Sequence, residues 1–410
     1  MFQKKFAIWL LLSLFYAYQY ALRVIPAISA NEIMMKLGLD AAQFGTFCGV
    51  YYIGYTAASI PLSIAIDRYN ARQVIVLTIA LVCLGITSLM TDNWYLAIAG
   101  RIITGIGSAG AILSLFKVIS VYFEPKQASK MLGIAVTIGL LGAIYGGKPL
   151  AILMGQIGFD ATIILLIIIG SCMAIAIYFL LPKKFPGNAE DNISISEVVS
   201  DIKQIFKNRA LILLAVAGGL MVGPMEGFVD GWSVITFKAI HGWADSDATL
   251  APSMIFLGMC IGASVIGIIT ERTQRYYSII GCSALVMVVC VGWIIWGNGE
   301  QMQLMLVVLF LIGVASAYQI VVMSKAGLLA GERLVTTGTS IANMIVMIFG
   351  SIYHSIIGNL ITKNNTLGSD LYSVESIQSG IIPLLIGLII AIVLLPVIRN
   401  FEAKSRIKKS

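Results

Sequence analysis

Long apolar stretches, separated by short polar segments, run through the whole chain. Because an α-helix rises about 1.5 Å per residue, about 20 apolar residues cross the hydrocarbon core of a bilayer. The pattern predicts twelve such helices, near residues 6–35, 44–66, 73–91, 95–122, 131–155, 160–181, 210–237, 248–270, 277–298, 301–328, 335–361 and 376–398. Within the longest polar break, apolar residues recur at helical spacing, which predicts a short amphipathic helix on the membrane surface.

The position of that polar break predicts the domain organisation. We expect an N-terminal six-helix bundle over 1–181, a cytoplasmic linker with the amphipathic helix over 182–209, a C-terminal six-helix bundle over 210–398 and a cytoplasmic tail over 399–410. Composition agrees, since 59% of residues are apolar and 11% are charged, against about 25% charged in soluble domains. The predicted fold class is an all-α membrane protein with 12 transmembrane helices in two bundles.

The net charge of +7 reflects where the cations lie. Most of the 27 lysines and arginines fall in predicted loops on the side of the N-terminus, and only Lys36, Lys238 and Lys363 fall in loops on the other side. Positive residues concentrate on the cytoplasmic side of membrane proteins. This distribution predicts a multi-pass protein of a bacterial inner membrane with both termini in the cytoplasm, and it does not support nucleic-acid binding.

An acid followed by an arginine occurs twice in the chain. Asp67-Arg68 follows one apolar stretch. Glu271-Arg272 follows another, 204 residues later in the chain. Five further residues recur 208 positions later in the chain. The pairs are Gly105 and Gly313, Ser108 and Ser316, Ala109 and Ala317, Lys117 and Lys325, and Glu124 and Glu332. Such repeats predict two halves of like orientation, related by a pseudo-symmetry axis along the membrane normal.

Three motifs are specific enough to indicate a family. The first is the loop Ser63-x-x-x-Asp67-Arg68-Tyr69-Asn70-Ala71-Arg72, the second is Arg101-x-x-x-Gly105-x-Gly107-x-x-Gly110, and the third is the loop 123–133, Phe-Glu-Pro-Lys-Gln-Ala-Ser-Lys-Met-Leu-Gly. Together they resemble the major facilitator superfamily, whose first motif reads Gly-x-x-x-Asp-Arg-x-Gly-Arg-Arg. Asn70 stands in place of a glycine, which is chemically conservative because asparagine tolerates left-handed backbone.

Three further stretches resemble the phagosomal transporter (Pht) group of intracellular bacteria. They are Tyr-Ala-Leu-Arg-Val-Ile-Pro at 20–26, Gly-Phe-Val-Asp-Gly-Trp at 227–232 and Gly-Thr-Ser-Ile-Ala-Asn-Met at 338–344. This resemblance implies uptake of amino acids or related small nutrients. Lys148 interrupts the proline-glycine motif of drug and proton antiporters, which argues against efflux.

Charged loops and helix ends are the candidate gates. Acids are not needed to anchor a loop, and both repeat-related loops carry one, so we predict that these charges close one access state; the alternative is that they are topology anchors. The predicted gating residues are Asp67, Arg68, Arg72, Arg101, Glu271, Arg272 and Arg275. Arg101 shares a helix face with Gly105 and Ser108, which also suits helix packing.

Buried charges are the candidate substrate site, because an ionised side chain inside a membrane is costly and usually functional. In helix one, Tyr16, Gln19, Tyr20 and Arg23 fall on one face, ending in a cation. The alternative is a structural arginine whose donors are satisfied by carbonyls.

Helix seven carries the opposite charge. Glu226 and Asp230 are four residues apart, and Pro224 with Gly223 is expected to loosen the helix there. Two carboxylates this close in a low dielectric favour sharing one proton, which predicts a role in proton coupling. The alternative is a structural salt bridge to Arg23 or Lys148.

The resemblance implies a central cavity lined by helices one, four, seven and ten. There Arg23 would bind a substrate carboxylate, and Glu226 or Asp230 an ammonium. The rest of the predicted substrate set is Tyr51, Tyr55, Lys148 and Asn343.

Three residues are secondary candidates: Lys117, Lys325 and His354. Lys117 lies about 160° around helix four from Arg101, so the two cannot both face the cavity. The alternatives are snorkelling of the lysines to the interface and ordinary packing of the histidine.

No enzyme constellation is evident, since the chain has two histidines, no metal-spaced cluster and no phosphate-binding loop. We therefore predict a monomeric secondary transporter without cofactors, driven by a proton or other ion gradient, that imports a small zwitterion. The main alternative is a carrier of organic or phosphorylated anions, favoured by the five intramembrane cations against two acids. An efflux pump and a transporter-derived receptor are lesser alternatives.

Overall fold

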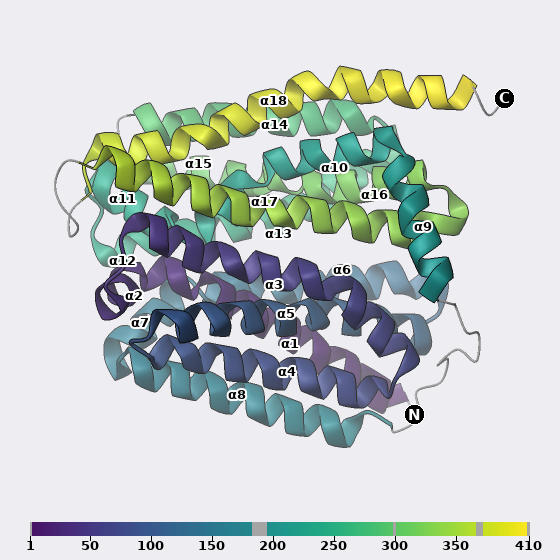
Figure 1. The fold of residues 1–410 in the computed structure, drawn as a ribbon, viewed down its shortest axis with the longest axis horizontal. Helices are drawn as coiled ribbons and strands as arrows, with labels where there is room; N and C mark the ends of the chain where they lie inside the picture. The colour runs from purple at the N-terminus through teal and green to yellow at the C-terminus, as the bar shows by residue number, and fades with distance from the viewer. Residues whose placement is uncertain (1, 183–194, 298–300, 366–371, 408–410) are drawn as a thin grey trace. The chain divides into compact units, whose positions relative to one another are not determined.

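The computed structural model describes residues 2–182, 195–297, 301–365 and 372–407 of the chain. Over these residues the protein is helical and has no β-strand. Among the described residues, 10 helices are long and apolar enough to cross a membrane, or up to 12 if each of two bent helix pairs counts as one span. The predicted all-α membrane fold is confirmed, and Figure 1 traces its helices.

The chain divides into two units, and each is described by itself. Unit 1 comprises Met1–Asp191 together with Ala244–Ser253, a short segment that comes later in the sequence. Its helices are α1 (Phe2–Ile28), α2 (Ala30–Leu37), α3 (Ala41–Arg68), α4 (Ala71–Thr87), the 3-10 turn η1 (Ser88–Met90), α5 (Trp94–Tyr122), α6 (Pro125–Tyr145), α7 (Lys148–Ile157), α8 (Phe159–Leu180) and α12 (Asp245–Ala248).

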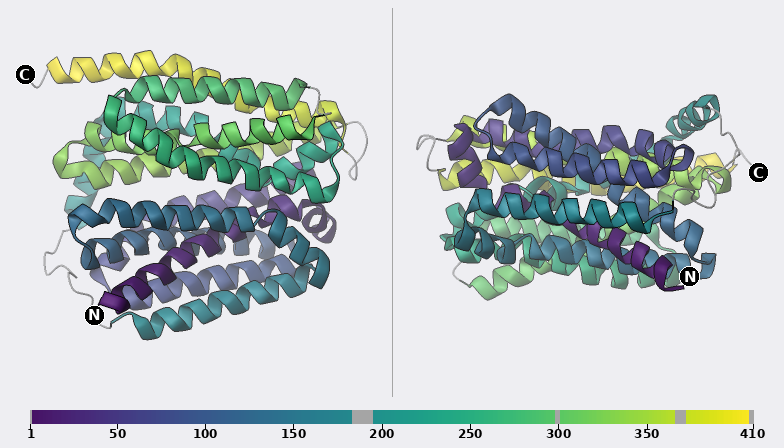
Figure 2. Two further views of the ribbon diagram at one scale, coloured as in Figure 1. Left: turned by 180° about the vertical axis from the view of Figure 1, so that it is seen from behind. Right: turned by 90° about the horizontal axis from the view of Figure 1, so that it is seen from below.

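Unit 2 comprises Asn192–Trp243 and Met254–Ser410. Its helices are α9 (Ile195–Lys207), α10 (Arg209–Met221), the π-helical turn η2 (Gly223–Val229), α11 (Ser233–His241), α13 (Leu250–Thr273, which begins in unit 1), α14 (Tyr276–Trp296), α15 (Met302–Ser316), α16 (Tyr318–Ala330), the 3-10 turn η3 (Glu332–Leu334), α17 (Val335–Asn364) and α18 (Val374–Ile407). In Figures 1 and 2, α17 and α18 run side by side.

The same close helix contact occurs in both units. A β-carbon on Gly105 of α5 would clash with the Tyr51 carbonyl of α3, and one on Gly313 of α15 would clash with the Ile255 carbonyl of α13. Small residues allow membrane helices to approach closely enough for extensive van der Waals contact. The repeat in the sequence thus corresponds to a repeated packing arrangement.

The fifth predicted span, residues 131–155, is bent, whereas the sequence predicts one continuous helix there. The axes of α6 and α7 differ by 44°, and Gly146 and Gly147 lie at the break. The Ser253 hydroxyl donates to the Ile144 carbonyl at 3.0 Å and accepts from the Lys148 amide at 3.4 Å. Ser253 therefore satisfies backbone groups that the bend removes from the helical ladder.

The chain also departs from prediction in three other places. Helix one ends at Ile28, and α2 follows as a separate helix. Helix seven is divided into α10, η2 and α11. The final helix does not stop at 398, because α18 continues to Ile407 through most of the segment predicted as a tail. The predicted linker residues 183–194 lie outside the described residues, whereas α9 lies where the amphipathic helix was expected.

Candidate functional site

An aromatic and cationic cluster in unit 1 forms around α1. The Arg23 guanidinium lies 4.6 Å from the centre of the Tyr20 ring, and the Tyr16 hydroxyl donates to that of Tyr20 at 3.4 Å. Gln19 and Arg23 are 3% and 5% exposed. Three side chains of the predicted stripe, those of Tyr16, Tyr20 and Arg23, thus contact one another in sequence along α1.

Helix α3 adds two tyrosines to this cluster. The Tyr51 hydroxyl donates to Gln19 Oε1 at 3.1 Å, and the rings of Tyr51 and Tyr55 stack with centroids 6.4 Å apart. Tyr55 also lies within electrostatic range of the Tyr16 hydroxyl. The structure therefore brings together six of the predicted substrate residues: Tyr16, Gln19, Tyr20, Arg23, Tyr51 and Tyr55.

Arg101 joins the same cluster from α5. Its guanidinium lies 5.0 Å from the centre of the Tyr51 ring and 5.3 Å from that of Phe47, and the residue is 3% exposed. The sequence predicts packing and gating for Arg101, but not this contact with a predicted substrate tyrosine. Two buried guanidiniums over aromatic faces make this part of unit 1 a suitable environment for a carboxylate or phosphate.

Unit 2 contains a break in helix seven that carries both acids. Pro224 has no amide hydrogen, and the chain forms a π-helical turn from Gly223 to Val229. Such turns are frequent at functional sites. Glu226 lies within the turn and Asp230 caps it, and each is 1% exposed.

Two tyrosines from other helices stabilise this break. The Leu220 carbonyl would ordinarily accept a hydrogen bond from residue 224, which is proline, and it accepts instead from the Tyr353 hydroxyl at 2.7 Å. The Gly218 carbonyl accepts from the Tyr318 hydroxyl at 2.6 Å. Tyr318 also lies within electrostatic range of Glu226. Sequence reasoning missed both tyrosines, although the Leu220–Pro224 spacing indicates that a replacement donor is needed.

Helix α17 packs against this π-turn and carries two further candidates. A β-carbon on Gly227 would clash with the β-carbon of Tyr353, so glycine allows α17 to approach. His354 is fully buried, and Asn343 lies about three turns earlier on α17 and is half-buried.

The two repeat-related lysines form ion pairs. Lys117 Nζ lies 3.0 Å from Asp67 Oδ1, and Lys325 Nζ lies 2.8 Å from Glu402 Oε1. The Tyr277 hydroxyl donates to Glu402 Oε2 at 2.6 Å, and Lys325 lies 5.2 Å from the centre of the Tyr277 ring. Both lysines thus pair with carboxylates, an arrangement that the sequence analysis did not predict.

The predicted gating residues differ in their surroundings. Arg68, Glu271, Arg272 and Arg275 are exposed, as gate charges in loops would be. Arg72 is 9% exposed instead, with its guanidinium 4.4 Å from the centre of the Tyr178 ring on α8. Arg72 therefore fastens α4 to α8 within unit 1.

The expectation for Asn70 is wrong. Its φ of −65° is not left-handed, whereas Gln274, which stands 204 residues after it in the second loop, has φ 54°. Asn70 instead precedes α4 in an extended conformation, where a side chain is tolerated without strain.

Lys148 forms an ion pair that the sequence analysis did not predict. Its Nζ lies 3.5 Å from Asp247 Oδ1, in the segment of unit 1 that comes from later in the chain. Lys148 thus helps to join α7 to α12.

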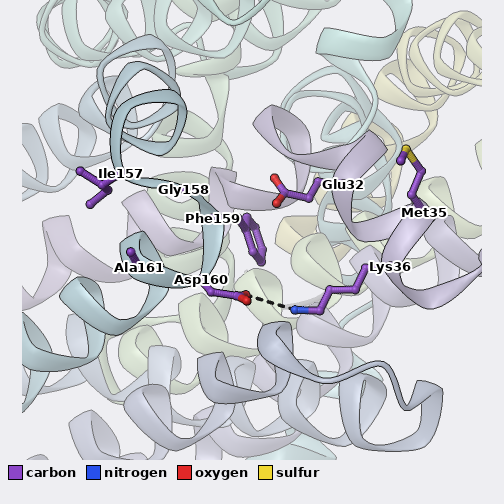
Figure 3. A pocket seen from close by; sticks show the side chains of 8 residues that line it. All are labelled: Glu32, Met35, Lys36, Ile157, Gly158, Phe159, Asp160 and Ala161. Atoms are coloured by element: carbon purple, nitrogen blue, oxygen red, sulfur yellow. Dashed lines mark hydrogen bonds and ion pairs between the residues drawn. The ribbon is translucent and has the colours of Figure 1, made fainter.

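An open pocket of about 640 Å³ lies between α2 and the start of α8, and none of its lining residues belongs to the predicted substrate set (Figure 3). Lys36 Nζ lies 3.1 Å from Asp160 Oδ1 across it. Partial burial, and secondarily the nearby Asp160 carboxylate, raise the pKa of Glu32. The pocket is open to solvent, so the candidate residues remain the cluster around Arg23 within unit 1 and, separately, the π-turn within unit 2.

The comparisons with known proteins identify the family of the chain. The profile of the Major Facilitator Superfamily matches residues 8–354, so the chain belongs to this superfamily. It is 22% identical over 404 residues to the hexuronate transporter of Bacillus subtilis (strain 168), covering 95% of this chain and 89% of that protein. It is 21% identical over 276 residues to the choline/ethanolamine transporter FLVCR2 of Homo sapiens, covering 60% of this chain and 51% of that protein.

A solved structure has the same fold. The inward-facing, unoccupied structure of a bacterial homologue of the human lysosomal transporter Spinster matches with a TM-score of 0.77 at 15% identity, covering 98% of each chain. Family and fold together define a secondary transporter with many membrane-spanning helices.

Proposed function

We propose that the protein imports an amino acid or a similar small zwitterion together with protons. The observation that carries this proposal is the π-turn of unit 2, which holds Glu226 and Asp230 almost fully buried in a membrane-spanning region. Ionised carboxylates in such surroundings require a cation or a proton that compensates their charge. In a proton-coupled importer of a zwitterion, the substrate ammonium and the coupling proton have this role. Unit 1 provides the complementary donors in Arg23 and its tyrosines.

In this proposal the substrate carboxylate binds the fork of the Arg23 guanidinium. The substrate ammonium binds one carboxylate of the π-turn, and the other carries the coupling proton. The polar atoms of Gln19, Tyr51 and Asn343 contribute to recognition. The charged loops around Asp67 and Glu271 act as gates of alternating access.

Three finer assignments belong to the same proposal. The protein acts as a monomer in a bacterial inner membrane, with both termini in the cytoplasm, and it is placed in the Pht group. The residues at 20–26, 227–232 and 338–344 support that placement. They include Arg23, Asp230 and Asn343, so the resemblance coincides with the proposed substrate set.

A carrier of organic or phosphorylated anions is the second candidate. It is favoured by Arg101, which joins Arg23 at the same tyrosine cluster and doubles the buried positive charge there. The similarity to a hexuronate transporter, whose named substrate bears a carboxylate, points the same way. The two candidates differ in whether the acids of the π-turn are needed.

Uptake of labelled substrate into proteoliposomes, driven by an imposed proton gradient, tests the proposal. A thermal-shift screen of amino acids, organic acids and sugar phosphates first identifies the ligand, because a ligand stabilises the folded state by mass action. Glu226→Gln and Asp230→Asn are then compared with Glu375→Gln, which neutralises an exposed glutamate of the same unit. We expect at least one π-turn variant to lose proton-driven uptake. Full uptake by both, together with stabilisation by organic or phosphorylated anions alone, would establish the anion carrier instead.

A further inference from the structure

Helix α9 runs nearly perpendicular to the membrane-spanning helix that follows it. The axes of Val199–Lys207 and Arg209–Met221 differ by 83°, and Figure 1 shows α9 turning away from α10 at this corner. Because α10 begins a span, α9 lies nearly in the plane of the membrane surface. A helix in this plane exposes one of its faces to headgroups or solvent along its whole length.

Three hydrogen bonds and one buried side chain show which face of α9 is turned toward the rest of unit 2. Asp201 Oδ1 accepts a charged hydrogen bond from Arg333 Nη2 at 2.6 Å, and Gln204 Oε1 accepts from the same nitrogen at 3.2 Å. Asn208 Nδ2 donates to the Leu329 carbonyl at 2.8 Å. Ile205, on the same side, is 1% exposed. These contacts hold α9 from one side and set its rotation.

The opposite face carries apolar and basic side chains. Val199 and Phe206 are 43% and 58% exposed, and Lys203 and Lys207 are exposed beside them. At about 100° per residue, Val199, Lys203 and Phe206 lie within about 60° of one another, and Lys207 lies next to Lys203. We call these four residues the outer face of α9. Arg209 is exposed at the corner with α10 and adds a third positive charge.

We propose that the outer face of α9 binds the anionic phospholipid surface of the leaflet beside it. An in-plane helix with aromatic and aliphatic side chains enters the boundary between headgroups and acyl chains, and flanking lysines attract anionic headgroups. Here the two lysines and Arg209 match that charge, while Phe206 and Val199 supply the apolar contact. This partner differs from the transported substrate, so the inference stands whether or not the proposed function is correct.

Hydrogen–deuterium exchange tests this proposal on the full chain in nanodiscs. The two lipid compositions are phosphatidylcholine alone, and phosphatidylcholine with phosphatidylglycerol. We expect the α9 amides to exchange several-fold more slowly with phosphatidylglycerol. Lys203→Gln/Lys207→Gln is expected to remove most of this protection, since each lysine near an anionic surface contributes about 5-fold in binding. The control Lys130→Gln/Lys404→Gln makes the same charge change at exposed lysines elsewhere and is expected to keep it.

Arg333→Gln separates the protein side of α9 from its lipid side. This variant removes the donor to Asp201 and Gln204, so protection of α9 is expected to fall in phosphatidylcholine and to persist with phosphatidylglycerol. Equal protection in the two lipids for the wild type would overturn the proposal and favour a protein partner or none. Unchanged lipid dependence in the double lysine variant would overturn it as well.

Discussion

Lys117 of unit 1 and Lys325 of unit 2 hold corresponding positions in the repeat, yet their carboxylates come from different parts of the chain. Lys117 pairs with Asp67, the acid of the loop motif, whose side chain is 60% exposed. Symmetry suggests Glu271 for Lys325, but the structure pairs it with Glu402, near the end of α18, and both side chains are 10% exposed or less. Both lysine side chains are thus largely buried, and the pairs differ in the carboxylate, which is solvated at Asp67 and buried at Glu402.

This difference in burial decides what each pair contributes. An exposed ion pair is screened by water and contributes little to stability, whereas removing one member of a buried pair leaves a charge without compensation. The pair in unit 1 is thus suited to opening and closing at low cost. The pair in unit 2 is suited to holding α16 and α18 together throughout the transport cycle.

Glu402→Gln is the most severe test of this comparison. We expect it to lower the free energy of unfolding by about 3–5 kcal/mol, because Lys325 would remain buried without its carboxylate. Denaturation of the purified protein measures the effect, with Glu375→Gln as the exposed control. Lys325→Met/Glu402→Leu is expected to recover much of the loss, and a double variant as unstable as the single one would contradict this account.

Tyr277→Phe tests the same network and is expected to have a smaller effect on the free energy of unfolding. The hydroxyl donates to the Glu402 carboxylate, and a hydrogen bond to a charged group contributes about 1.5–3 kcal/mol. Tyr276→Phe is the matched control, since its hydroxyl bonds the exposed side chain of Gln274. Equal destabilisation by both changes would show that the Tyr277 hydroxyl has no special role.

Asp67→Asn addresses the unit 1 pair. We expect a change in stability of about 1 kcal/mol or less, because the Asp67 carboxylate is largely exposed and its charge is screened by water. If the loop is a gate, the rate of transport falls while ligand-induced thermal stabilisation persists. A loss of stability as large as that of Glu402→Gln would remove the distinction between the two lysine pairs.

The smallest expected effects lie at titratable groups near the ends of the units. Burial lowers the pKa of His241 below its ordinary 6.5, so the unfolded state binds more protons and unit 2 loses stability as the pH falls through that value. In unit 1, burial raises the pKa of Glu32, so its contribution has the opposite sign. The measurement is the difference between the melting temperatures at pH 7.5 and pH 5. We expect this difference to be smaller in His241→Gln and larger in Glu32→Gln than in the wild type. The reverse order would contradict both assignments.

Much of the fold follows from the sequence because hydrophobic length is a local property. Apolar stretches of about 20 residues located the spans, and Pro224 indicated the loosened helix seven. The bend at Gly146 and Gly147 was missed, because its stability depends on Ser253, which is distant in the sequence. The continuation of α18 was missed because the charges after 398 resemble a solvated tail, while Glu402 is buried by Lys325 and Tyr277.

The candidate site was predictable only where its residues share one helix. The stripe from Tyr16 to Arg23 and the spacing of Glu226 and Asp230 are visible in the sequence. Contacts between helices are not, so the approach of Arg101 to Tyr51 and the bond from Tyr353 to Leu220 were not foreseen. The partner of Lys148 could not be predicted either, because Asp247 lies about a hundred residues later in the sequence.

The segment Ala244–Ser253 makes unit 1 discontinuous along the chain. A fragment that ends in the linker contains every spanning helix of the first half, but it lacks the hydroxyl that bonds Ile144 and the carboxylate that bonds Lys148. Synthesis from the N-terminus therefore leaves the first half unfinished until the second half has begun. The break between α6 and α7 thus acquires these side-chain bonds only from sequence made about a hundred residues later.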